Sequence, residues 1–278
     1  MSESAKIGGP DEDAIDDDDV DGGKQPLLQH LMELRNRLLY SVAAIFVAFV
    51  FCFIFAEDIY AVLMQPLVDV LGADSGRRMI FTALHEAFFT YIKVAFWAAF
   101  ILAFPIIASQ IYMFVAPGLY DNERGAFLPF LIATPILFII GGSMVYFLVM
   151  PLAWDFFLSF ETLGSEGELA IQLEPKVNEY LSLVMKLIFA FGLCFQLPVL
   201  LTLLAKVGLA SSSGLRAKRK YAIVGVFVVA AVVTPPDPIS QLTLAIPIII
   251  LYEISIFCAI YVEKKRRQKE AALDAEQA

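Results

Sequence analysis

The sequence predicts an all-α membrane protein that crosses the bilayer about six times. Of its 278 residues, 59% are hydrophobic and only 18% are charged, and the mean hydropathy is +0.73. A soluble domain cannot bury that much apolar surface. Several apolar segments approach the roughly 20 residues that a helix needs to cross the hydrocarbon layer. In lipid, a helix satisfies its own backbone hydrogen bonds, so these segments are expected to be spanning helices.

The first 24 residues form an acidic segment that we expect to be a disordered tail. Much of the net charge of −9 lies in the run from Asp11 to Asp21, outside any apolar segment. No basic stretch precedes an apolar one there, so we expect no cleavable signal peptide. The first spanning segment must then act as the insertion signal.

An amphipathic surface helix is expected over residues 25–37, followed directly by the first span, 38–56. Residues 57–87 connect it to the second span, 88–115, and part of this connection should be a helix packed at the interface. Pro66 lies in the connection, Lys93 lies near the start of the second span, and Pro105 should kink it. The helical stripe of the surface helix consists of Leu27, Leu28, Leu31, Leu34 and Leu38.

The third span, 127–150, contains Gly141 and Gly142, whose small size allows another helix to approach closely. The fourth, 180–207, carries Gln196 at its centre, where an amide needs a hydrogen-bonding partner. Gln196 could simply hold helices together, or it could belong to a cavity.

A basic loop at residues 216–220 precedes an unusually short apolar run, 221–234, that reaches only about 20 Å. A tight turn at Pro235, Pro236 and Asp237 leads into the last span, 239–262, which contains the ionisable Glu253. Residues 263–278 are expected to form a basic and then polar tail. Because Lys and Arg near span ends stay on the cytoplasmic side, this charge pattern predicts that both termini are cytoplasmic.

The stretch from Phe104 to Arg124 is where the second helix should leave the membrane and turn, because Pro117 and Gly118 stop it. Glu123 then falls in the first turn of the next helix, where the helix dipole stabilises a carboxylate. Glu33 and Arg37, at i and i+4, form a pair that stabilises any exposed helix. From these patterns alone, helix stability explains both glutamates better than binding does.

Catalytic and metal-binding patterns are missing from the sequence. The three cysteines fall in separate apolar segments without CxxC spacing, and neither histidine belongs to an HExxH motif. GxSxG and GxxxxGK[ST] motifs are also absent. We therefore expect no enzyme activity, no metal and no cofactor.

Four motifs stand out in the sequence: HLMELRNRL at 30–38, FPIIASQIYMFVAPGLYDNER at 104–124, FGLCFQLPV at 191–199 and TPPDPISQ at 234–241. In order and spacing they resemble the motifs of the TatC family, the multispanning signal-peptide receptors of the twin-arginine protein translocase. The resemblance runs from Pro26 to Val262 and leaves out the acidic tail.

The resemblance implies a concave, glove-like arrangement of kinked helices in the bacterial inner membrane, and movement of folded proteins driven by the proton-motive force. The implied partners are TatA, TatB, twin-arginine precursors, lipid and further copies of the chain, and not nucleic acid. Gln196 departs from the glutamate often found in the family. The residues that match the signal-peptide site are Glu33, Arg35, Phe114, Pro117, Tyr120 and Glu123.

Carboxylates suit this recognition, because the guanidinium group presents a rigid fork that fits them. Two charge-assisted pairs at about 2 kcal/mol each would give roughly thousandfold discrimination, whereas exposed pairs would give far less. The site should therefore be partly screened from water. A different hypothesis is a secondary transporter using Lys93, Gln196 and Glu253, although the internal repeats usual in such folds are not visible in the sequence.

Overall fold

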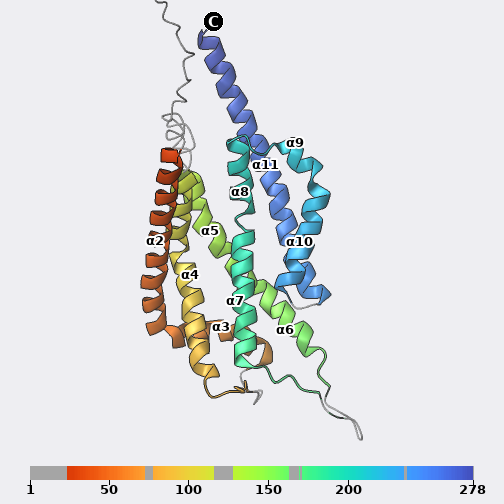
Figure 1. Cartoon of the computed structure of the whole chain (residues 1–278). Coiled ribbons are helices and arrows are strands. Elements are labelled where there is room, and N and C mark those ends of the chain that lie inside the picture. Colours follow the sequence, from red (N-terminus) through yellow and green to blue (C-terminus); the bar gives the residue numbers. More distant parts are fainter. Residues whose placement is uncertain are drawn as a thin grey trace, which may run out of the picture.

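The computed structural model describes residues 24–72, 78–115, 128–162, 169, 171–234 and 237–277, and its regular elements there are helices (Figure 1). The only strand-like features in these ranges are two isolated bridges, Ile80 with Lys176 and Thr162 with Ile171. In chain order the helices are α2 (Lys24–Ile54), α3 (Ala56–Leu71), α4 (Glu86–Val115), α5 (Leu128–Met144), the π-helical η3 (Val145–Val149), α6 (Met150–Leu158), α7 (Val177–Cys194), α8 (Leu197–Lys206), α9 (Ser212–Ala217), α10 (Arg219–Val233) and α11 (Pro238–Gln277).

Five helical stretches in the described part are long and apolar enough to cross a membrane, which confirms the predicted class of fold. The predicted span that is not among these five is the fifth, 221–234, which corresponds to α10, whose 15 residues reach only about 22 Å. The predicted count of about six is therefore close to the five found, and α10 accounts for the difference. The five stretches are His30–Ile54, Glu86–Phe114, Pro129–Leu158, Val177–Lys206 and Ser240–Gln268.

Helix α2 runs without interruption from the predicted surface helix into the first span, and it packs mainly against α4. Small side chains line the contact on both helices, so the two backbones can approach closely. Most other side chains of α2 are exposed, as expected for a helix at the edge of a bundle in lipid. The buried residues along this contact are Ala48, Cys52 and Ala56 of the α2–α3 segment and Ala95, Ala99 and Ala103 of α4.

The predicted close approach of another helix to Gly141 and Gly142 is confirmed. A Cβ atom added to Gly141 would lie 2.8 Å from the backbone oxygen of Phe191 on α7, and one on Gly142 would lie 3.2 Å from the Ile188 side chain. On α7, Gly192 gives the same room to the Phe138 ring of α5. The contact between α5 and α7 is therefore shaped by glycines on both helices.

Helix α3 lies in the connection where the sequence predicted a helix, and Pro66 lies inside it. Proline has no N–H, so the carbonyl of Val62, four residues earlier, lacks its usual helical partner. The hydroxyl of Tyr146 donates to this carbonyl at 2.8 Å, and the Tyr180 hydroxyl donates to the Leu63 carbonyl at 2.9 Å. Two tyrosines from the η3 and α7 segments thus fasten α3 to the bundle.

The structure describes the predicted kink residue Pro105 and one residue of the predicted turn, Asp237. Pro105 lies inside α4, which continues through it. Asp237 precedes α11 and accepts the Ser240 N–H at 2.7 Å, as an N-cap does. Pro235 and Pro236 lie outside the described residues.

Helix α11 continues well past the predicted end of the last span, and Figure 1 shows its C-terminal part projecting beyond the other helices.

Gly141→Ala is expected to destabilise the protein by about 1–3 kcal/mol, because the new methyl group would meet the Phe191 backbone rather than a flexible side chain. Gly225→Ala on α10 is the matched control, since nothing lies within 4 Å of its added Cβ, and it should stabilise by about 0.5–1 kcal/mol. Thermal unfolding of the detergent-solubilised chain measures both. Equal effects of the two changes would contradict the close approach.

The role of Tyr146 can be separated from general packing by a double-mutant cycle with Pro66. Tyr146→Phe leaves the Val62 carbonyl without its hydroxyl donor and should cost about 0.5–1.5 kcal/mol of unfolding free energy. Pro66→Ala supplies a backbone N–H to the same carbonyl, so Tyr146→Phe should cost less in that background. An identical cost in both backgrounds would show that the hydroxyl does not replace the missing N–H.

Candidate functional site

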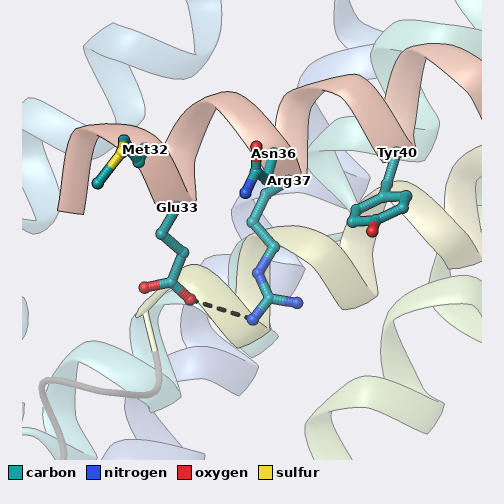
Figure 2. Close-up of a pocket in the computed structure, with 5 residues that line it drawn as sticks. All are labelled: Met32, Glu33, Asn36, Arg37 and Tyr40. Atoms are coloured by element: carbon teal, nitrogen blue, oxygen red, sulfur yellow. Dashed lines mark hydrogen bonds and ion pairs between the residues drawn. The ribbon is translucent and has the colours of Figure 1, made fainter. Parts of the chain in front are cut away.

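An open pocket of about 440 Å³ lies on α2, near the end of the molecule where α2 begins and α4 ends. Figure 2 shows the five residues that line it, all from successive turns of this helix: Met32, Glu33, Asn36, Arg37 and Tyr40. The pocket therefore contains one of the two glutamates that the sequence singled out. Among the described residues that line it, one carries a carboxylate and one a guanidinium group.

Glu33 and Arg37 form the ion pair that their spacing predicted. The Arg37 Nη2 atom lies 3.0 Å from Glu33 Oε1, and Figure 2 shows both side chains extending from the same side of α2. Their side chains are only 28% and 31% exposed for Arg37 and Glu33 respectively. The carboxylate is thus partly screened from water, as the recognition of paired arginines was predicted to require.

Arg37 also connects α2 to the end of α4. Its Nη1 atom lies 3.4 Å from the Gln110 Oε1 acceptor and 3.4 Å from the Met113 sulfur. Phe114 lies one turn after Gln110 on α4, and its ring stacks on the His30 ring of α2. The ring centroids are 4.4 Å apart and the ring planes are 20° from parallel. These contacts hold the last turns of α4 beside Glu33.

The predicted site residues are only partly brought together in the described part of the chain. Phe114 lies beside the start of α2, whereas Arg35 is exposed and donates to its neighbour Asn36 at 3.3 Å. Pro117, Tyr120 and Glu123 lie outside the described residues. Sequence reasoning did not single out His30 or Gln110, although both fall within the quoted motifs.

Gln196 lies between α7 and α8 and has the partner that a buried amide was expected to need. Its Nε2 donates to the Thr134 carbonyl of α5 at 2.9 Å, with a longer contact to the Gly192 carbonyl at 3.4 Å. The Thr134 hydroxyl in turn lies 3.0 Å from the Tyr112 hydroxyl of α4. This network joins α4, α5 and the α7–α8 junction. The Gln196 Oε1 atom is buried without a partner among the described residues.

Lys93 and Glu253 each have a separate partner. Lys93 lies 2.7 Å from Asn178 Oδ1 at the start of α7, and Glu253 forms a 2.6 Å ion pair with Arg219 at the start of α10. Asn178 and Gln196 are 18 residues apart, which is about 27 Å along a helix. Lys93, Gln196 and Glu253 therefore do not form one solute site. No group of three or more metal-binding side chains occurs in the ranges described.

Comparison with known proteins agrees with the motifs. The family model described as Sec-independent protein translocase protein (TatC) matches residues 29–247. A protein of that name from Magnetococcus marinus is 53% identical over 253 residues, covering 91% of this chain and 90% of the relative. Its counterpart from Escherichia coli K12 is 42% identical over 247 residues, covering 88% and 93%.

Solved structures extend the agreement to three dimensions. A crystal structure of the twin arginine translocase receptor TatC superposes with a TM-score of 0.72 at 37% identity, covering 84% of this chain and 99% of that one. The helical fold is thus shared over most of both chains. The chain belongs to the TatC family of Sec-independent protein translocase components.

Proposed function

We propose that this chain is the signal-peptide receptor of a twin-arginine translocase and that Glu33 and Glu123 receive the paired arginines. As a member of the TatC family, the chain is a component of a Sec-independent protein translocase and not an enzyme. The proposal adds which side chains take part. Glu123 is included on the motif resemblance, since it lies outside the described residues.

The observation that supports the proposal is that Glu33 already binds a guanidinium group. Arg37 occupies Oε1 at 3.0 Å in a pocket that is open to an approaching peptide, and no described residue donates to Oε2. An arriving arginine can therefore bind the second oxygen or displace Arg37. Displacement costs little, because a partly exposed i,i+4 pair contributes only about 0.3–0.5 kcal/mol.

The neighbouring motif residues would shape the peptide's path rather than carry charge to it. Phe114, stacked on His30, forms an apolar surface beside Glu33, and Pro117 and Tyr120 follow it in the sequence. Arg35, which is exposed on the same helix as Glu33, would belong to the same peptide-binding site. In this proposal the apolar part of the signal peptide lies along the bundle near Gln196.

The cellular setting is also part of the proposal. The end of the molecule that holds Glu33 also carries the basic segments 216–220 and 264–267, and such ends stay cytoplasmic. We place the chain in the bacterial inner membrane with both termini inside. TatA, TatB and further copies of the chain would be its partners, and the proton-motive force would drive transport.

Glu33→Gln should weaken binding of a twin-arginine signal peptide by about thirtyfold, because one charge-assisted pair of about 2 kcal/mol is lost. Binding to the full chain in nanodiscs, measured by fluorescence anisotropy, tests this. Glu123→Gln should have a similar effect. A peptide with Lys-Lys in place of Arg-Arg should bind weakly to the unmodified chain and lose little further affinity in either variant.

Glu179→Gln is the matched control for Glu33→Gln. Glu179 also belongs to a short-range helical ion pair, with Lys176 at 3.5 Å, but its side chain is 72% exposed. The Glu179→Gln variant should therefore bind the signal peptide as tightly as the unmodified chain. If Glu33→Gln and Glu123→Gln bind the peptide as tightly as this control, neither glutamate receives the arginines.

The proposed orientation predicts the labelling pattern of two single cysteines in a variant without Cys52, Cys194 and Cys258. In spheroplasts, a membrane-impermeant maleimide should label Thr162→Cys, in the loop after α6, and should label Lys264→Cys only after the membrane is broken. Both positions are exposed in the structure. The opposite pattern would reverse the orientation and place Glu33 outside.

A further inference from the structure

Eight exposed cationic side chains gather where α9 and the start of α10 meet α11, at the end of the molecule where α2 begins. We call them the α9–α11 basic surface. Its two clusters, one from the α9–α10 segment and one from α11, are Arg216, Lys218, Arg219 and Lys220, and Lys264, Lys265, Arg266 and Arg267.

Specific contacts hold the two clusters on one surface. The Tyr252 hydroxyl of α11 donates to the Leu215 carbonyl at 2.8 Å, and Glu253 pairs with Arg219 at 2.6 Å. Farther along α11, Glu263 accepts both the backbone N–H and the hydroxyl of Ser212 at 2.6 Å. Helix α9 and the start of α10 are therefore fixed against α11.

The positive charge of this surface is poorly compensated within the described part of the chain. Glu253 and Glu263 contact it, and each is already engaged. Arg216, Lys218, Lys264 and Lys265 form no ion pair with another described residue. These four side chains can therefore bind an anion without first breaking an ion pair.

Lipid headgroups alone do not match the extent of this surface. Arg219 of the first cluster contacts Glu253 of α11 at 2.6 Å. Lys264 follows Glu253 by 11 residues, which is about 16 Å farther along α11. The headgroup layer is only about 5–8 Å deep on each side. An anion that covers both clusters has to be an extended chain rather than a headgroup.

The chain itself contains such an anion. Residues 11–21, DEDAIDDDDVD, contain eight acidic side chains and no cation, and they lie outside the described residues. Fully extended, 11 residues span about 36 Å, enough for both clusters. This segment also falls outside residues 29–247, the part matched by the family model.

The acidic segment can reach the surface from its attachment point. Helix α2 begins at Lys24, and contacts lead from α2 to α4, α5, α8 and α11 in turn. Four such steps of about 8–10 Å amount to no more than roughly 40 Å. The 13 residues from Asp11 to Lys24 can span about 45 Å, so even at this upper limit the acidic side chains nearest Asp11 reach α11 while the others bridge to Lys24. Attachment to the same chain also raises the effective concentration to the order of millimolar.

We propose that residues 11–21 bind the α9–α11 basic surface of the same chain. The tail then neutralises a cationic surface of its own protein instead of competing at Glu33 for the arginines of a signal peptide. Many weak and partly exposed pairs hold it, so binding is reversible and strongly dependent on salt. The surface becomes available to other anionic partners when the tail is released.

Carbodiimide crosslinking of the full chain tests this proposal, because it joins a carboxylate to a lysine amine only where the two are in contact. In nanodiscs of zwitterionic lipid at about 50 mM salt, mass spectrometry should find residues 11–21 joined to Lys218, Lys220, Lys264 or Lys265. Raising the salt to about 500 mM should reduce these crosslinks at least about fivefold. Lys176, at the other end of the molecule, is the internal negative control.

Two variants separate charge from mere proximity. Changing Asp16, Asp17, Asp18 and Asp19 to Asn keeps the tail's length, leaves four carboxylates able to react, and should reduce crosslinking at least about fivefold. Lys264→Glu with Lys265→Glu should reduce crosslinks to Lys218 and Lys220 as well. Crosslinks that are absent at low salt, or unchanged in both variants, overturn the proposal.

Two further experiments test whether lipid headgroups bind the α9–α11 basic surface and whether the tail binds the arginines of a signal peptide instead. The crosslinks should persist in nanodiscs that contain phosphatidylglycerol, and their loss there would assign the surface to lipid headgroups and overturn the proposal. A twin-arginine peptide should bind equally well with and without residues 1–23 at low salt. Crosslinks from the tail to the peptide in place of the α9–α11 basic surface would also overturn it.

Discussion

The absence of water from the hydrocarbon layer is the constraint on which this structure depends, because each backbone donor and acceptor there needs a partner from the protein. Regular helices meet this requirement by themselves, and the irregular positions show how side chains meet it elsewhere. Pro66 leaves a carbonyl that Tyr146 satisfies, and Gln196 donates to a carbonyl of α5 at the junction of α7 and α8. Polar side chains thus supply partners at these two irregular positions.

The absence of water also requires charged side chains to be paired or to lie at the end of the bundle. Lys93 is paired with Asn178, and Glu253 is paired with Arg219 near the start of α10. Glu33 is held by Arg37 at the end of the bundle, where partial exposure keeps desolvation modest. A carboxylate in this position can exchange one guanidinium group for another without being stranded as a bare buried charge, which would cost far more.

Local patterns in the sequence predicted much of this structure, but they could not predict contacts between residues that are far apart in the chain. Apolar length predicted the spanning helices and the shortness of α10, and i,i+4 spacing predicted the Glu33–Arg37 pair. Gly141 and Gly142 indicated a close approach, but the partner Phe191 is 50 residues away along the chain and no local pattern names it. Tyr146 meets Val62 across 84 residues, and Lys93 meets Asn178 across 85. Such pairs are decided by how whole helices pack.

The continuation of α11 beyond the bundle has a steric consequence. Residues 264–277 add 14 helical residues, a rod about 21 Å long, past the level at which α9 begins. A folded globular protein several tens of ångströms wide cannot lie flat across that end of the molecule. It has to approach the start of α2 from the side away from α11, so the rod limits the directions from which bulky cargo can arrive.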